Sequence, residues 1–121
     1  MVKKRISLIC IEGEREKGML KHIKEQEFGK EISSGINIVN FYASWCGPCL
    51  ILDQTLEELS NSRTGYNILK IDVDENKKIV NSLGVDTVPS LYVYKDGKFI
   101  DKQIGCISKK DLIEFIEEKI K

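Results

Sequence analysis

Two cysteines lie two residues apart in the segment SWCGPC, where Gly47 and Pro48 separate Cys46 from Cys49. Cysteines at this spacing can hold a metal ion, form a structural disulfide or work as a reversible dithiol. In the last case, one thiolate attacks a disulfide of another molecule and the second thiol then releases the product. The rest of the chain has to decide among these three kinds of chemistry.

The cysteine pair lies between an expected strand and an expected helix. Residues 36–43 are β-branched and aromatic, and apolar on both faces, as in a strand inside a sheet. Leucines then recur at i, i+4 and i+7 from Leu52, which predicts a helix that begins near Cys46. A thiol at a helix N-terminus faces unpaired N–H groups and the positive end of the helix dipole, which both favour the thiolate. We therefore expect Cys46 to attack the substrate disulfide. Cys49 lies one turn into the helix and should be less exposed, so we expect it to resolve the mixed disulfide.

The remaining patterns predict alternating strands and helices around this pair. Four local signals mark their limits: Asp74 as a helix cap, Gly84 as a helix stop, Asp96-Gly97 as a hairpin turn, and Ser108 at the start of a capping box. The expected elements are a strand at 19–23, a helix at 25–33, strands at 36–43 and 66–73, a short helix before residue 84, strands at 90–94 and 98–104, and a last helix after residue 108. This order predicts an α/β fold, a mixed sheet with helices on both faces.

The beginning of the chain is harder to interpret. Residues 5–11 have the composition of one more strand, which the minimal plan does not need. They either add an edge strand or pack loosely. We therefore divide the chain into an N-terminal extension at 1–17 and one domain at 18–121.

Composition excludes several classes of function. The chain has 121 residues, 41% hydrophobic and 31% charged, and nineteen basic residues balance nineteen acidic ones. No net charge therefore attracts it to nucleic acid or to an anionic membrane. No apolar run approaches the roughly 20 residues that span a bilayer, and the start lacks a complete signal peptide. We expect a cytoplasmic protein, and in that compartment a close cysteine pair is catalytic or metal-binding more often than structural.

The other possible ligands argue against a metal site. Zinc sites commonly use four Cys or His ligands in two close pairs, whereas Cys10 and Cys106 are isolated and His22 is the only histidine. A structural disulfide between cysteines this close would restrain little of the unfolded chain. A working dithiol is the favoured interpretation, with no metal and no cofactor.

Two longer segments of the sequence support the interpretation of the cysteine pair as a working dithiol. FYASWCGPC, residues 41–49, resembles the active-site segment of the thioredoxin family, and residues 69–98 are similar to the family's third strand, third helix, pre-proline loop and hairpin. The resemblance covers roughly residues 18–121. It implies a three-layer α/β/α sandwich with a central mixed sheet and a cis peptide bond between Val88 and Pro89. It also implies a flat, mostly apolar docking surface made of Trp45, Gly47, Pro48, Val88, Pro89 and Gly105.

Several further positions follow from the same resemblance. Lys70 matches a family lysine near the dithiol, where a cation would lower thiol pKa values. Asn40 occupies the position of a usually buried aspartate that accepts the proton of the resolving cysteine, so we expect that step to depend on solvent or another base. Leu50 and Gln54 depart from the family pattern. Cys106 is either a small buried hydrophobe, which we favour, or a second redox-active thiol.

These observations predict a protein-disulfide reductase that works through a mixed disulfide. Its partners would be disulfide-containing proteins and a thioredoxin-reductase-type electron donor, and we expect a monomer. One alternative is a disulfide isomerase or oxidase of the same fold, although such relatives commonly place a histidine between the cysteines. The other is a thioredoxin-like binding subunit with little catalytic activity.

Overall fold

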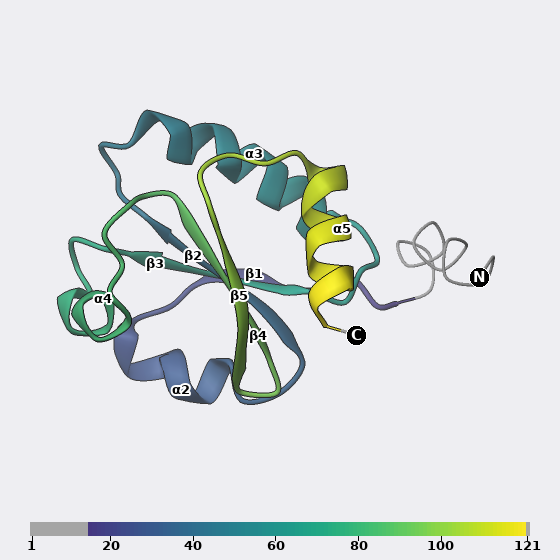
Figure 1. Ribbon diagram of the computed structural model, residues 1–121, viewed down its shortest axis with the longest axis horizontal. Helices are drawn as coiled ribbons and strands as arrows, with labels where there is room; N and C mark the ends of the chain where they lie inside the picture. The colour runs from purple at the N-terminus through teal and green to yellow at the C-terminus, as the bar shows by residue number, and fades with distance from the viewer. Residues whose placement is uncertain (1–14, 121) are drawn as a thin grey trace.

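The computed structural model describes residues 15–120, in which the strands form one central sheet and the helices lie around it (Figure 1). In chain order the elements are β1 Leu20–His22, the 3-10 helix η1 Glu25–Glu27, α2 Phe28–Glu31, β2 Ile36–Tyr42, α3 Gly47–Asn61, β3 Asn67–Asp72, α4 Lys77–Leu83, β4 Ser90–Lys95, β5 Lys98–Ile104 and α5 Lys109–Lys119. The expected strand at 5–11 lies outside the described residues.

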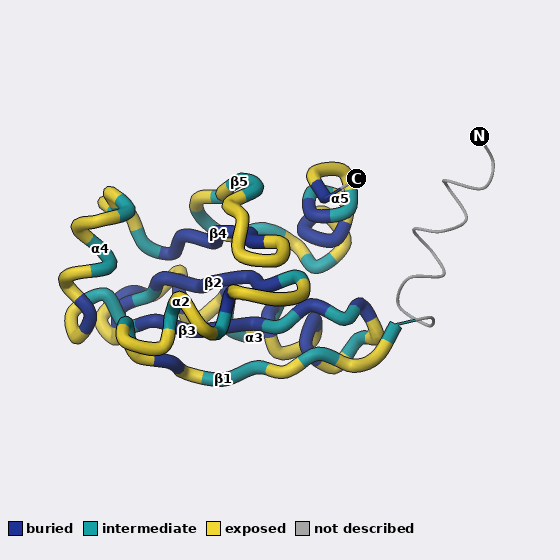
Figure 2. The backbone as a smooth tube through the Cα atoms, turned by 90° about the horizontal axis from the view of Figure 1, so that it is seen from below, coloured by how far each residue is buried: buried dark blue, intermediate teal, exposed yellow. Residues whose placement is uncertain are grey.

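The sheet is mixed, as the sequence predicts. Its five strands follow the order β1-β3-β2-β4-β5. β3 runs parallel to β1 and β2, whereas β4 runs antiparallel to β2 and to β5. The buried residues gather in β2, β3 and β4, while the outer elements are largely exposed (Figure 2). The continuous apolar run of β2 is explained by this central position, since both of its faces are covered.

Two apolar clusters fill the space between the sheet and the helices. In one, leucines of α3 and α5 such as Leu56 and Leu112 pack on Ile38 of β2 and Ile68 of β3. In the other, side chains of the α2 and α4 region pack on the opposite face, around Phe41. Helices thus cover both faces, and the predicted three-layer α/β/α sandwich is confirmed.

The turn signals of the sequence are mostly correct. Gly84 ends α4 in the left-handed conformation. Asp96 and Gly97, with φ of 51° and 87°, form the tight turn between β4 and β5, and glycine tolerates this region at no steric cost. Ser108 caps α5 by accepting a hydrogen bond from the Asp111 N–H. The expected hairpin and last helix are therefore confirmed.

One local prediction is wrong, and another needs its end adjusted. The segment expected as a helix at 25–33 is helical over 25–31, where η1 runs directly into α2, so this prediction is correct apart from its end. Asp74 does not cap α4, whose N-cap position is Asn76. Asp74 lies two residues too early, and its carboxylate is engaged by Trp45.

Candidate active site

Cys46 and Cys49 lie at the junction of β2 and α3 and are joined by a disulfide, with their Cα atoms 5.3 Å apart. Cys46 occupies the N-cap position of α3, and its Sγ accepts a hydrogen bond of 3.2 Å from the Cys49 N–H. The exposed fractions are 5% for Cys46 and 2% for Cys49. A free helix N–H that points at sulfur stabilises negative charge there, so Cys46 is the cysteine favoured as a thiolate.

The loop before β4 packs against this pair. The Val88–Pro89 peptide bond is cis, and the Val88 carbonyl oxygen lies 3.9 Å from Cys46 Sγ. Gly105, with φ of 87°, donates its N–H to the Pro89 carbonyl at 2.9 Å. Residues from β2–α3, the β4 loop and the end of β5 are thereby brought together, although as many as 59 positions separate them in the chain.

The predicted docking residues differ in exposure. Trp45 is 70% exposed, and Gly47 and Pro48 are exposed beside it. Val88 and Gly105 are half-buried, whereas Pro89 is buried. Pro89 is therefore less accessible than the other predicted docking residues, because it leads directly into the central strand β4.

Asp74 is a site residue that sequence reasoning missed. Its Oδ2 accepts a hydrogen bond of 2.8 Å from Trp45 Nε1. This bond orients an exposed indole next to the disulfide. The signal in the sequence was misleading, since an aspartate just before a helix is more often a cap.

The first turn of α3 also extends the apolar surface. Leu50 and Ile51 are 65% and 63% exposed, and both lie off the leucine stripe that faces the core. From the sequence, Leu50 stands out only as a departure from the family pattern, and Ile51 is not singled out. The signal for both was available, because apolar residues next to Cys49 that miss the helical stripe have to face outward.

On β3, Lys70 is buried and forms an ion pair with α3. Its Nζ lies 2.7 Å from Asp53 Oδ1. The same ammonium lies 5.0 Å from the centre of the Tyr42 ring, which in turn packs against the two cysteines. Burial, followed by the charges of Asp72, Glu75 and Asp53, raises the pKa of Tyr42.

Asn40 is completely buried in β2, and its side chain has no hydrogen-bond partner among residues 15–120. Its neighbour across the ladder in β3 is Lys70. Leaving a buried amide unpaired costs about 1–3 kcal/mol. An unsatisfied polar group in the central strand that leads to the cysteines is a typical feature of a functional site.

Cys106 is exposed, so the favoured prediction of a buried hydrophobe is wrong. Its thiol donates to the Pro48 carbonyl at 3.3 Å, which places it beside the cysteine pair. The preceding Gly105 turns the chain out of β5 and away from the core, and Cys106 follows it to the surface.

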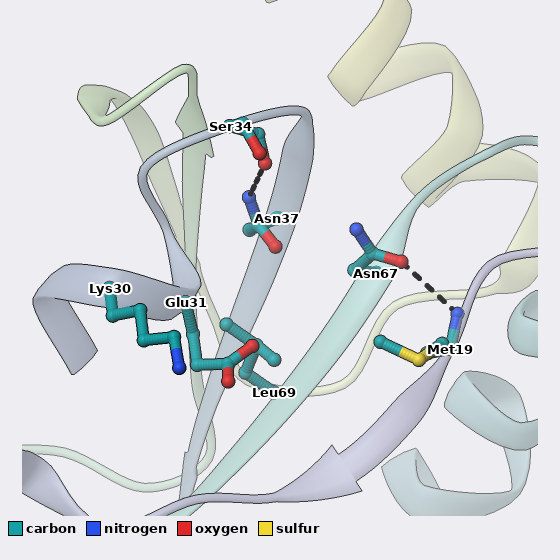
Figure 3. A pocket seen from close by; sticks show the side chains of 7 residues that line it. All are labelled: Met19, Lys30, Glu31, Ser34, Asn37, Asn67 and Leu69. Atoms are coloured by element: carbon teal, nitrogen blue, oxygen red, sulfur yellow. Dashed lines mark hydrogen bonds between the residues drawn. The ribbon is translucent and has the colours of Figure 1, made fainter. Parts of the chain in front are cut away.

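A separate pocket lies at the opposite end of the sheet, where β2 and β3 begin (Figure 3). The amides that line it are engaged: Asn37 donates to the Ser34 carbonyl, and Asn67 accepts from the Met19 N–H. None of the described cysteines lines this pocket. It therefore does not belong to the redox site.

Comparisons with known proteins agree with this geometry. The family model described as Thioredoxin matches residues 19–118. Thioredoxins of Staphylococcus saprophyticus and Staphylococcus epidermidis are 42% and 38% identical to the chain over 99 residues, which are 81% of this chain and 95% of each relative. The solved structure of a mutant thioredoxin from Halobacterium salinarum has a TM-score of 0.78 and 30% identity, and the match covers 88% of this chain and 95% of that one.

A thioredoxin-like fold with a cysteine pair at the start of a helix defines a redox-active protein. The chain belongs to the thioredoxin family and is a thiol–disulfide oxidoreductase, as the sequence predicts. The family acts by dithiol–disulfide exchange on disulfide-containing proteins and works with reductase partners. Within residues 15–120, no helix is both long and apolar enough to cross a membrane.

Proposed function

We propose that this chain is a protein-disulfide reductase in which Cys46 is the nucleophile and Cys49 the resolving thiol. The observation that carries the proposal is the Cys49 N–H aimed at Cys46 Sγ from the first turn of α3. The Cys46 thiolate attacks one sulfur of a substrate disulfide and expels the other as a thiolate. The Cys49 thiolate then attacks Cys46, which forms the Cys46–Cys49 disulfide and releases the second substrate sulfur. The substrate gains two electrons, and the protein dithiol loses them.

The substrate is proposed to lie across the exposed apolar residues around Cys46. Trp45 and Pro48 offer side-chain surface, and a Cβ at Gly47 would have no atom within 4 Å, so another backbone can approach there. The Val88 main chain next to Cys46 Sγ is suited to pair with an extended substrate segment. This mode of binding depends on main-chain contacts and suits many sequences.

The remaining assignments are proposed on the same basis. The chain works as a cytoplasmic monomer, and a thioredoxin-reductase-type partner returns its disulfide to the dithiol. Residues 18–121 form the working domain and residues 1–17 an extension, a division that agrees with the start of the family match at residue 19. Arg15, in this extension, already contacts the body of the domain, since its guanidinium donates to the Thr64 carbonyl at 3.0 Å.

Reduction of insulin disulfides with dithiothreitol as electron source tests the reductase proposal. We expect the wild-type protein to accelerate insulin precipitation and the Cys46→Ser variant to match dithiothreitol alone. The Cys49→Ser variant should accumulate a mixed disulfide through Cys46, which intact-mass measurement detects. Wild-type activity no higher than that of Cys46→Ser would favour the binding subunit, an alternative that the unusual apolar Leu50 keeps open.

The reduction potential separates a reductase from an isomerase or oxidase. With Gly47 and Pro48 between the cysteines, no histidine is present there to stabilise the thiolate. We expect a potential more negative than about −230 mV, the reducing end of the range for glutaredoxins. Equilibration with glutathione buffers measures it. A potential above about −200 mV would favour the isomerase or oxidase alternative.

A further inference from the structure

The resolving cysteine needs a proton acceptor that position 40 does not provide. Cys49 is nearly inaccessible, so its thiol has little direct contact with bulk water. The amide of Asn40 cannot take up a proton at neutral pH. An inference about the acceptor rests on the proposed function, because it assumes that Cys49 performs the second step.

Asp53 lies one helical turn after Cys49 on α3. Residues four apart on a helix are neighbours, with about 5–6 Å between their Cβ atoms. Side chains in a helix also tilt toward its N-terminus, so Asp53 extends over the turn that contains Cys49. The Asp53 side chain is partly exposed, which gives it an exit for a proton to solvent.

Lys70 fixes this carboxylate from the sheet side. Its Nζ is 2.7 Å from Asp53 Oδ1, and it stands above the Tyr42 ring that packs on the cysteine pair. Asn40 is its neighbour in the ladder, and side chains paired in this way share one face of the sheet. The unpaired amide of Asn40 is thus a second polar group on the face that α3 covers.

The other titratable groups around this carboxylate are less suited to accept the proton. Burial and the charges of Asp72, Glu75 and Asp53 raise the pKa of Tyr42, so its phenol keeps its proton at neutral pH. His22 contacts the Tyr42 hydroxyl from the edge strand β1, with β3 between it and β2. Lys70 is already engaged by Asp53.

We propose that Asp53, oriented by Lys70, is the general base that accepts the Cys49 proton in the resolving step. The Cys49 S–H bond breaks and its proton passes to the Asp53 carboxylate, directly or through a water. The resulting thiolate forms the bond to Cys46 Sγ, and the bond between Cys46 and the substrate sulfur breaks. The substrate leaves as a thiolate, takes up a proton from solvent, and Asp53 returns its own proton to solvent.

Asp53→Asn tests this role in single-turnover reactions of the reduced full chain with a peptide disulfide. Samples are quenched with acid at successive times, and intact mass gives the fraction of protein held as mixed disulfide. We expect release to slow about tenfold near neutral pH, below the usual range for general-base help because a thiol ionises readily. The deficit should vanish above pH about 9, where a cysteine thiol ionises unaided.

Three further variants make the result specific. Glu57→Gln removes a carboxylate from an exposed position one turn further along α3 and should release as fast as wild type. Asn40→Asp, added to Asp53→Asn, should restore release by supplying a carboxylate on the facing strand. Cys49→Ser reports the attack of Cys46 alone, which Asp53→Asn should leave unchanged.

The outcomes separate this inference from the proposed function. If Cys49→Ser traps no mixed disulfide, the roles of the two cysteines fail. If it does trap one and Asp53→Asn releases substrate as fast as wild type at every pH, only the role of Asp53 is overturned. Faster release would also overturn it, because that is the result expected if Asp53 merely neutralised Lys70 and so disfavoured the nearby thiolate.

Discussion

The polar side chains at the two ends of the central strands differ in whether they have hydrogen-bond partners. Just before β3, the Tyr66 hydroxyl donates to Glu117 of α5, and the Arg15 guanidinium donates to both oxygens of the same carboxylate, at 2.8 and 3.3 Å. At the other end, on the strand that leads to the cysteines, the Asn40 amide has no partner in the described part of the chain, and an ion pair joins Lys70 to α3. We call these the Glu117 network and the Asn40 end.

The contrast indicates which end serves stability and which serves chemistry. The Glu117 network joins the start of the described chain, the sheet and the last helix, and its groups satisfy one another. Fully paired polar networks, such as this partly buried one, stabilise a fold, whereas unpaired buried groups persist mainly where function requires them. Substitutions at the two ends should therefore have opposite effects on stability.

The largest effect on stability is expected at Glu117. In Glu117→Ala, the Arg15 guanidinium and the Tyr66 hydroxyl lose their shared acceptor. Hydrogen bonds to charged groups contribute about 1.5–3 kcal/mol, so the free energy of unfolding should fall by about 2 kcal/mol. Urea denaturation measures the change, and Glu118→Ala, at the exposed neighbouring position, is the control. An equal loss in both variants would mean that the network adds nothing beyond helix propensity.

The same network predicts a loss of stability at alkaline pH. Burial, and then the hydrogen bond and charge of Glu117, raise the pKa of Tyr66. Above pH about 10 the unfolded chain releases the tyrosine proton while the folded chain keeps it, so stability falls by up to about 1.4 kcal/mol per pH unit. Denaturation at several pH values should show this slope in the wild type and a shallower one in Tyr66→Phe. Identical slopes would contradict the prediction.

At the Asn40 end, an apolar residue should stabilise the protein. Asn40→Leu keeps a similar shape and removes two polar atoms that have no partner in the structure of residues 15–120. We expect the free energy of unfolding to rise by about 1 kcal/mol, at the low end of the penalty for an unpaired buried group. Thermal and urea denaturation test it. A less stable variant would show that the amide is satisfied in solution, and the contrast between the two ends would disappear.

The smallest effect on stability is expected at Cys106, whose thiol is exposed. Cys106→Ser should unfold at the wild-type denaturant concentration, since no packing is lost. In the oxidised protein, Cys106 should react with iodoacetamide under native conditions while Cys46 and Cys49 do not, because they are joined. Peptide mass spectrometry locates the label. A Cys106 that is unmodified until the protein unfolds would contradict its exposed position.

Local sequence patterns predicted the frame of the site well. The strand before Cys46, the helix after it, the turn at Asp96-Gly97 and the cap at Ser108 each depend on neighbours within a few residues. Asp74 shows where this approach fails. The Asp74 carboxylate could accept a hydrogen bond either from a helix N-terminus or from an indole N–H. It binds the indole of Trp45, which lies 29 positions away in the chain.

By itself, the sequence determined the position of the cysteines at the end of a buried strand and the start of a helix, because periodicity and helix-terminus chemistry are local. Only the tertiary structure decided which polar groups found partners. Lys70 and Asp53 are 17 positions apart and meet because α3 folds back across β3, while Asn40 remains unpaired between two strands. Cys106 reached the surface beside Pro48 in the same way. Such contacts depend on how whole elements pack, and no short stretch of sequence specifies that.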